Sequence, residues 1–265
     1  ALFFTDRGKA YQIKMYELPE GKRATKGKAI VNYLSLGDGE RVTSVLAIGK
    51  GSDMKGKSHF MVTRAGTAKK VSAESFEDVR RSGIIAIKLA ACLPAARGAA
   101  QAGDELLSAL LVEKKDSVSL VTEKGQSIRF DEKDIREMGR GAVGVRAMKL
   151  GKNDKIVGAG VIKAGAEATV LVVSENGYGK RTNIKEYKVQ KRGGSGIKTA
   201  QVTAKTGRVV SGAIVTEETE IVTISKKGQV IKTDLATIPK LGRQTQGVRI
   251  MKMRDGDSIA SAVCL

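Results

Sequence analysis

The sequence predicts an all-β protein built from propeller-like blades of four strands, and three observations support this fold class. The chain has 31 glycines but only 3 prolines, a balance that favours short strands joined by glycine turns. Apolar runs of strand length recur along the whole chain. One arrangement of these runs occurs five times with a period of about 50 residues, which is typical of four-stranded blades.

Each repeat opens with an apolar strand that ends at a turn glycine. These strands are LFFT, HFMVT, VSLVT, VLVVS and IVTIS, and the turn glycines are Gly8, Gly66, Gly125, Gly177 and Gly228. A second glycine follows 17 residues later in the second repeat and 19 residues later in the others, at Gly27, Gly83, Gly144, Gly196 and Gly247. We therefore assign the repeats to residues 1–57, 58–115, 116–167, 168–218 and 219–265, within a single domain that spans residues 1–265.

The other strands of each repeat follow in a fixed order. The second strand comes directly after the turn and alternates between apolar and polar residues, as in QSIRF and QVIKT. The third strand is predicted at AIVNYL, IIAIKL, VRAMKL, IKTAQV and VRIMKM. The fourth strand is predicted at VTSVLAI, LLSALLV, IVGAGVI, VVSGAIV and IASAVCL.

The composition indicates a polyanionic partner. The chain carries 47 Lys and Arg against 28 Asp and Glu, so we expect nucleic acid, with a basic ribosomal-type or membrane-surface protein as the alternative. No apolar run approaches the roughly 18–20 residues of a membrane span, and the first residues lack the basic region of a signal peptide. The chain begins without Met, which suggests a piece of a longer protein, and its two cysteines fit a reducing cytoplasm.

The cations recur at corresponding positions in the repeats. One set lies four residues before the second glycine: Arg23, Arg140, Arg192 and Arg243, with Arg80 and Arg81 in the shorter second repeat. Another lies two residues after that glycine: Arg146, Lys198 and Arg249, with Lys28 one residue nearer and Lys26 beside it in the first repeat. A third set follows the turn glycine: Lys70, Arg129, Arg181 and Lys232, with Lys69 and Lys180 next to two of them. Equivalent positions in an array of blades fall on one rim, so these residues predict a continuous basic track.

Such a track is suited to the backbone of duplex DNA. Guanidinium groups match phosphate geometry, and glycine N–H groups permit a close approach. Stacking on single strands would require interleaved aromatic residues, which make up only 4% of the chain. No element is suited to reading base edges in a groove, so we expect little sequence specificity. The alternative for each single cation is an ordinary solvated face.

The sequence offers no catalytic or metal-binding set. The GxGxxG match at residues 139–144 is followed by a strand rather than a helix, and it coincides with the second-glycine position of its repeat. His59 is the only histidine and has neither a cysteine nor a second histidine nearby in the sequence, so we interpret it as a structural residue. We expect no catalysis, no metal and no cofactor in this chain.

The segment Gln190–Gly196 reads QKRGGSG and resembles the box QRRGGKG of the C-terminal domain of the DNA gyrase A subunit. Gln190, Arg192, Gly193, Gly194 and Gly196 match this box, Lys191 replaces an arginine and Ser195 replaces a lysine. The segments KMYELPEGKRATKGKAIVNYL, SENGYGKRT and LGRQTQGVRIMKM also resemble blades of this family, so the resemblance covers the whole chain.

The resemblance implies a β-pinwheel of about five to six blades in which neighbours exchange one strand. DNA would wrap around the basic rim and set the hand of the DNA crossover for supercoiling. The parent enzyme would be a bacterial, cytoplasmic, ATP-dependent type II topoisomerase, a heterotetramer with a B subunit that hydrolyses ATP, so that ATP and Mg²⁺ bind elsewhere. This domain itself would be monomeric, and no tyrosine in it follows an arginine as the strand-cleaving tyrosine of the family does.

Two departures from the family pattern leave alternatives open. The family commonly has six blades with the box in the first, whereas this chain has five repeats with the box-like segment in the fourth. One alternative is therefore the related C-terminal domain of the topoisomerase IV A subunit, which would favour decatenation and relaxation. The other is a propeller-like scaffold for protein interactions.

Overall fold

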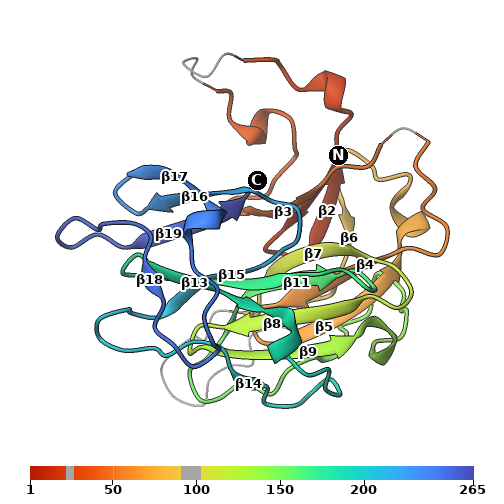
Figure 1. Cartoon of the computed structure of the whole chain (residues 1–265). Helices are drawn as coiled ribbons and strands as arrows, with labels where there is room; N and C mark the ends of the chain where they lie inside the picture. Colours follow the sequence, from red (N-terminus) through yellow and green to blue (C-terminus); the bar gives the residue numbers. More distant parts are fainter. Residues whose placement is uncertain (22–26, 50, 91–102) are drawn as a thin grey trace, which may run out of the picture. The chain divides into compact units, whose positions relative to one another are not determined.

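The computed structural model describes residues 1–265 except 22–26, 50 and 91–102. Its contacts divide the chain into two compact units, Ala1–Glu113 with Ile135–Val145, and Lys114–Asp134 with Arg146–Leu265. The described residues form nineteen strands and six short 3-10 helices, and these ranges contain no α-helix (Figure 1). The prediction of an all-β fold is confirmed.

The strands occur in the predicted order within each repeat. The first strands are β1 (Leu2–Thr5), β4 (Ser58–Thr63), β8 (Ser117–Thr122), β12 (Thr169–Ser174) and β16 (Glu220–Ser225). The second strands are β2 (Lys9–Gln12), β5 (Thr67–Ser72), β9 (Gln126–Asp131), β13 (Tyr178–Asn183) and β17 (Val230–Asp234). The third strands are β6 (Ile84–Ile85), β10 (Val145–Arg146), β14 (Ile197–Lys198) and β18 (Val248–Arg249). The fourth strands are β3 (Val42–Leu46), β7 (Leu106–Val112), β11 (Ile156–Ile162), β15 (Val209–Val215) and β19 (Ile259–Cys264).

The 3-10 helices mark the turns that follow second strands, with one exception in the first repeat. They are η1 (Met15–Glu17), η2 (Ile30–Asn32), η3 (Ala73–Phe76), η4 (Glu132–Asp134), η5 (Ile184–Glu186) and η6 (Leu235–Thr237). In the fourth and fifth repeats, the side chains of Asn183 and Asp234 cap the turn by accepting hydrogen bonds from the backbone N–H groups of Lys185 and Ala236.

The first strand is the central strand of each blade. Strand β8, for example, pairs antiparallel with β9 on one edge and with β11 on the other. All six residues of β4, β8 and β12 are buried. A strand that is covered on both faces needs apolar or small residues at every position, which explains why these strands read as continuous runs such as VLVVS rather than as alternating sequences.

The third strand pairs outside its own repeat. Strand β6 of the second repeat pairs antiparallel with β2 of the first, β14 of the fourth pairs with β9 of the third, and β18 of the fifth pairs with β13 of the fourth. In the same way, β10 of the third repeat borders β5 of the second. Each of the second to fifth repeats therefore donates one short strand to the preceding blade, which is the exchange that defines a pinwheel. It also explains why Ile135–Val145, from the third repeat, belongs to the first unit.

The segment AIVNYL of the first repeat is a correction to the predicted strands. It contains η2 rather than a third strand, and the side chains of Ile30 and Val31 are exposed. A third strand forms by pairing with the second strand of the preceding repeat, and the first repeat has no such neighbour within these 265 residues. The segment thus has the apolar sequence of a third strand but does not pair with another strand in this structure.

Each unit has its own core. In the first unit, Phe4, Met61 and Phe76 belong to one buried cluster, and Phe3 and Tyr11 belong to another. In the second unit, Val170 and Tyr187 belong to one cluster, while a further cluster includes Leu171, Leu235 and Met251.

His59 lies inside the first unit, although the sequence places it only at the start of a strand. Its side chain is fully buried, and its ring meets that of Phe76 edge-on, with 4.8 Å between the ring centres. Neither ring nitrogen has a hydrogen-bond partner among the residues that the structure describes. Burial lowers the pKa of His59 to about 4, so the imidazole is neutral at pH 7.

Candidate nucleic-acid interface

In the second to fifth repeats, the second glycine brings its loop against the preceding repeat. At Gly196 the backbone has a φ of +76°, and an added Cβ would lie 2.4 Å from the carbonyl oxygen of Ser127. At Gly247, with a φ of +82°, it would lie 2.5 Å from the carbonyl oxygen of Gly179. Both the backbone conformation and the close approach require glycine. Gly144 makes the same contact with Ala68, which supports the view that repeat geometry accounts for the GxGxxG match.

Arg192 and Arg243, four residues before Gly196 and Gly247, contact the backbone of the preceding repeat. Arg192 donates from Nε to the carbonyl oxygen of Asp134 at 2.8 Å and from Nη1 to that of Arg146 at 3.0 Å. Arg243 donates from Nη1 to the carbonyl oxygen of Lys198 at 3.2 Å. Positions 146 and 198 are themselves equivalent, each two residues after a second glycine. Within the second unit, each of these loops therefore lies beside an exposed cation of the preceding third strand.

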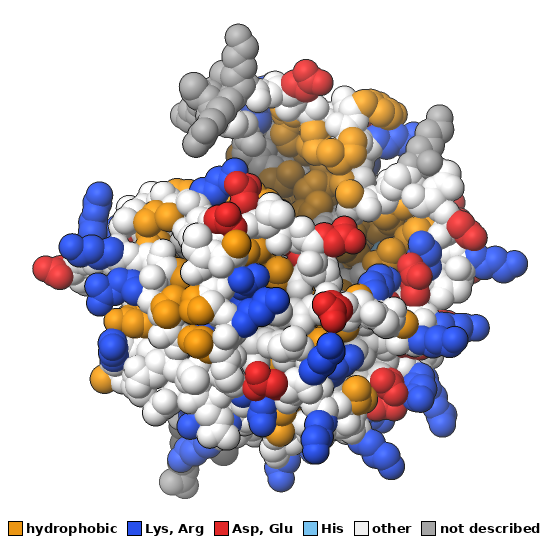
Figure 2. Space-filling model, in the orientation of Figure 1, with side chains coloured by type: hydrophobic (Ala, Val, Ile, Leu, Met, Phe, Trp, Pro, Cys, Tyr) orange, Lys and Arg blue, Asp and Glu red, His pale blue; other side chains and the backbone are white. Residues whose placement is uncertain are grey.

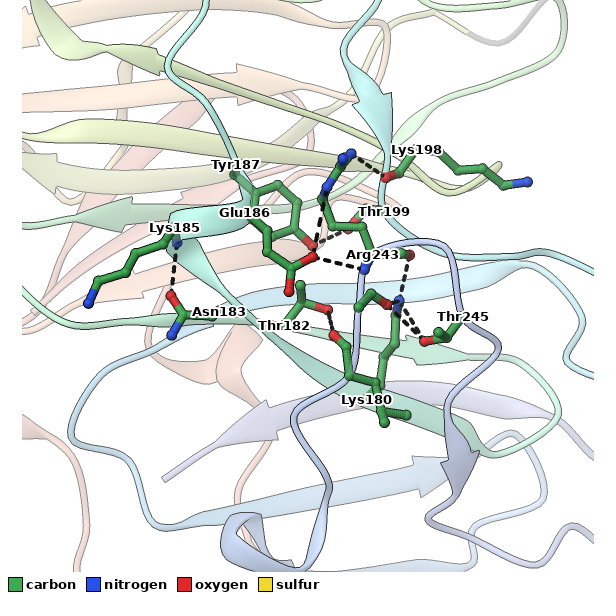
Figure 3. Close-up of polar contacts among 12 residues, drawn as sticks. Lys180, Thr182, Asn183, Lys185, Glu186, Tyr187, Lys198, Thr199, Arg243 and Thr245 are labelled. Carbon is green, nitrogen blue, oxygen red and sulfur yellow. Dashed lines mark hydrogen bonds and ion pairs between the residues drawn. The ribbon is translucent and has the colours of Figure 1, made fainter.

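Lys69 and Lys180 are buried, which removes them from the surface set that the sequence predicted. Their relative exposures are 0% and 1%. Lys69 donates from Nζ to the carbonyl oxygens of Gly139 at 3.1 Å, of Ala142 at 3.0 Å and of Arg140. Lys180 donates to the carbonyl oxygens of Gly242 at 2.6 Å and Arg243 at 2.5 Å and to Oγ1 of Thr245 at 3.1 Å (Figure 3).

The buried ammonium groups have altered acidity. Burial lowers the pKa of Lys69 to about 8, and the nearby Arg140 acts in the same direction. Burial also lowers the pKa of Lys180 to about 8, with Glu186 opposing and Arg243 reinforcing this shift. Three oxygen acceptors for each Nζ compensate for part of the cost of burying the charge.

Arg129 and Arg181, four residues after the turn glycine, are partly buried and bind neighbouring backbone. Arg129 donates from Nε to Oγ of Ser117 at 3.0 Å and from Nη1 to the carbonyl oxygen of Tyr187 at 3.4 Å. Arg181 donates from Nε to the carbonyl oxygen of Ile238 at 2.8 Å. In both cases the acceptor comes just after the 3-10 turn of the next repeat, so these arginines join successive blades of the second unit.

The remaining predicted cations are at or near the surface. Arg80, Arg81, Arg146, Lys191, Lys198, Lys232, Arg249 and Lys28 are exposed, and Lys70 is half-buried. Lys232 pairs with Glu220 at 2.7 Å, and Arg249 lies over the ring of Tyr178 at 5.6 Å. Arg23 and Lys26 lie outside the described residues. The face drawn in Figure 2 carries many projecting Lys and Arg side chains, with fewer Asp and Glu among them.

The box-like loop QKRGGSG is held by backbone hydrogen bonds instead of a lysine. Gly193 donates to the carbonyl oxygen of Ala147 at 2.6 Å, and Gln190 donates to that of Arg129 at 2.7 Å. The residue beneath the loop is Ile128, whose Cδ1 lies 3.6 Å from the position that a Cβ on Gly194 would take. Lys191 and Ser195 are exposed.

The contacts of Lys69 and Lys180 with the following loops do not follow from the pattern of surface charge on which the predicted basic track depends. Three residues after the turn glycine, the five repeats have Tyr11, Lys69, Ile128, Lys180 and Ile231. A column that alternates lysine with tyrosine and isoleucine is typical of an inward-facing position, and this signal was available in the sequence.

The described residues contain neither a candidate metal site nor a helix suited to spanning a membrane. No group of three His, Cys, Asp or Glu side chains in that part of the chain is arranged to hold a metal ion. No helix there is long and apolar enough to cross a membrane.

Comparison with known proteins places these features in a family. A family model described as "DNA gyrase C-terminal domain, beta-propeller" matches residues 1–48, 60–113, 116–163, 168–216 and 219–265. The DNA gyrase A subunit of Staphylococcus epidermidis is 36% identical over 262 residues, which cover 98% of this chain and 28% of that protein. Its counterpart from Mycolicibacterium smegmatis is 38% identical over 260 residues, which cover 97% and 29%. The chain thus spans less than a third of the length of these relatives.

Solved structures agree with this result. A structure of the DNA gyrase A C-terminal domain superposes with a TM-score of 0.78 at 29% identity, covering 99% of this chain and 81% of the other. The C-terminal domain of a DNA topoisomerase IV superposes with a TM-score of 0.83 at 21% identity, covering 100% and 78%. The second likeness concerns the fold alone.

Proposed function

Because this chain belongs to the family of DNA gyrase C-terminal domains, we propose that it binds duplex DNA by its phosphate backbone and bends or wraps the duplex. The observation that carries this proposal is the exposure of Arg146, Lys198 and Arg249 at equivalent positions of successive repeats. In the second unit, Arg192 and Arg243 add guanidinium groups beside the first two of them. Regular spacing of cations suits a regularly spaced polyanion better than a compact acidic partner.

The wider assignment follows from the family. We propose that the domain is non-catalytic and forms part of the A subunit of a type II topoisomerase in the bacterial cytoplasm. The A subunit would act in a heterotetramer with an ATP-hydrolysing B subunit, and ATP and Mg²⁺ would bind outside this domain. Wrapping would fix the hand of the DNA crossover and so direct supercoiling.

Salt dependence tests the binding mode. The affinity for a duplex of about 40 base pairs, measured by fluorescence anisotropy, should fall linearly with salt on a log–log scale, with a slope of about −0.9 for each phosphate neutralised. Duplexes of different sequence should give the same slope and similar affinities. An affinity independent of salt, or equal affinity for heparin and DNA with no topological effect, would instead favour a protein-interaction scaffold.

A ring-closure assay tests wrapping separately from binding. Nicked circles sealed in the presence of the domain should acquire a defined shift in linking number. The double variant Lys191→Ala, Arg192→Ala should reduce this shift more than it reduces affinity, whereas Lys198→Ala should reduce both in proportion. Equal behaviour of the two variants would mean that the box-like loop is one basic contact among several. A domain that binds DNA without any shift would favour the topoisomerase IV type.

A further inference from the structure

The two buried lysines occupy one structural position in two different blades. Lys69 and Lys180 each stand three residues after a turn glycine, on β5 and β13. Each sends its ammonium group into the basic loop of the following repeat, residues 139–142 for Lys69 and 242–245 for Lys180. These loops carry Arg140 and Arg243, which are equivalent members of the predicted DNA-binding set.

The hydrogen bonds to lysine determine which way the loop peptides face. In a trans peptide the C=O and the following N–H point in opposite directions, and the described chain has no cis peptide bonds. Because the carbonyls of Gly139, Arg140 and Ala142 face Lys69, the N–H groups of Arg140, Gly141 and Val143 face away from it. Outward-facing N–H groups in a glycine-rich turn are available to donate to an anion.

The loop of the fifth repeat already carries an oxyanion on that outer side. The N–H of Arg243 donates to the carboxylate of Glu186 at 3.2 Å, while the other end of the same peptide, the carbonyl of Gly242, accepts from Lys180 (Figure 3). A carboxylate oxygen resembles a phosphate oxygen in charge and in its ability to accept hydrogen bonds. The outer face of a lysine-held loop is therefore suited to a phosphate oxygen.

We propose that Lys69 and Lys180 are positioning residues, which hold the loops at 139–142 and 242–245 so that their backbone N–H groups and arginines face a DNA phosphate. Neither lysine touches DNA in this arrangement. The proposal rests on the DNA binding proposed above and divides the basic loops into two classes. The loops of the third and fifth repeats are held from beneath by an ammonium group, whereas QKRGGSG rests on the apolar Ile128 and is positioned by its backbone hydrogen bonds and by the Arg192 side chain.

Matched variants at this position test the proposal. Lys180→Met and Lys69→Met keep the unbranched apolar stem of the side chain and remove its terminal ammonium group, with its charge and its donors. Ile128→Met places the same side chain at the equivalent position of the third repeat, where the proposal expects no effect on the loop. Amide hydrogen exchange should be at least about tenfold faster at residues 242–245 in Lys180→Met and unchanged at 190–196 in Ile128→Met.

The salt dependence of DNA binding separates positioning from direct contact. Lys180→Met should lower the affinity about threefold or more, and it should reduce the log–log slope by no more than Arg243→Ala does, because the lysine has no phosphate contact of its own and acts only through that loop. The exposed Lys191→Met should instead make the slope less steep by about 0.9. A change of slope in Lys180→Met larger than that in Arg243→Ala would overturn the proposal, and so would unchanged exchange in the loop or an affinity equal to that of the wild type.

Two outcomes need a separate readout. If Lys180→Met does not fold, nuclear magnetic resonance of the wild-type domain replaces it: slowly exchanging ammonium protons of Lys180 with couplings to loop carbonyls would support the proposal, and rapid solvent exchange of these protons would overturn it. If the wild type does not bind DNA, the proposed function fails. The positioning role at the loop is then decided by amide exchange alone, with unchanged exchange overturning it.

Discussion

Arg192 donates a hydrogen bond from Nη1 to the carbonyl oxygen of Arg146 at 3.0 Å, although the two residues belong to different repeats. The same guanidinium binds the carbonyl oxygen of Asp134 through Nε, so most of its fork is directed at the preceding blade. The arginine of the box-like loop is therefore a structural link as well as a candidate phosphate ligand. The structural role predicts that losing Arg192 lowers stability, whereas losing the neighbouring Lys191 should affect DNA binding alone.

Replacing Arg192 by Ala should weaken both folding and DNA binding. The loss of two hydrogen bonds from a charged but exposed donor should lower the free energy of unfolding by about 1 kcal/mol, as measured by urea denaturation. Lys191→Ala, next to it, should lower DNA affinity without measurable loss of stability. An Arg192→Ala variant as stable as the wild type would show that the carbonyl contacts contribute nothing.

Glu186 should oppose DNA binding. Its carboxylate accepts from the N–H of Arg243 at 3.2 Å and lies 4.0 Å from Nε of that residue. Glu186→Gln should therefore raise the DNA affinity about two- to threefold at low salt, because a negative charge beside the loop is removed. Glu167→Gln is the matched control, since Glu167 is 91% exposed and pairs with Lys185 instead. An equal gain in both variants would indicate only a change in net charge.

The backbone of Gly196 should not tolerate a side chain. Gly196→Ala combines a φ of +76° with a contact of 2.4 Å to the carbonyl oxygen of Ser127. We expect it to reduce the free energy of unfolding by on the order of 3 kcal/mol. Gly151→Ala serves as the control, because its backbone φ is not positive and no atom lies within 4 Å of an added Cβ. Comparable effects from both substitutions would refute this explanation of the glycine.

His59 should make the domain sensitive to mild acid. The folded-state pKa of about 4 lies below the unfolded value of 6.5, so the unfolded chain binds the proton more tightly. This stabilisation is fully present above pH 6.5 and is lost as the pH falls through 6.5 towards 4, amounting to about 2 kcal/mol between pH 7 and 5. His59→Leu should flatten this part of the stability profile in urea titrations. If the dependence of stability on pH were the same in His59→Leu as in the wild type, the loss of stability in mild acid would not come from His59.

Local features of the fold could be predicted from the residues themselves, whereas the exchange of a strand between repeats was implied only by the family resemblance. Turn glycines and apolar runs depend on residues close in sequence, so the central strands and their hairpins were assigned correctly. Strand exchange joins residues such as Ile197 and Ser127, and nothing in the spacing of either repeat states which strand its neighbour receives. For the same reason the assignment of AIVNYL as a strand is wrong. Its apolar sequence favours a strand, but a third strand also needs the second strand of a preceding repeat, and the sequence of the segment does not report whether one is present.

In the candidate site, too, some cations could be placed from the sequence and others could not. Exposure of Arg146, Lys198 and Arg249 follows from two-residue alternation, and sequence predicted them as surface cations. Lys69 and Lys180 were assigned to the surface because lysine is rarely buried, and only the shape of the following loop supplies the acceptors that permit burial. Charge was thus predictable, but the direction in which a charged side chain points was not.

The donation of third strands to the preceding blade has a consequence for how such arrays gain and lose members. If an internal repeat is deleted as a whole, the third strand of the next repeat meets the second strand of the one before, and every remaining edge still finds a partner. An insertion of a whole repeat is tolerated for the same reason. A shortening from the C-terminal side moves the unpaired edge: within the described residues β17 ends its sheet, and without the fifth repeat β13 would take its place. The number of blades in this architecture can therefore change without adding an unpaired second strand.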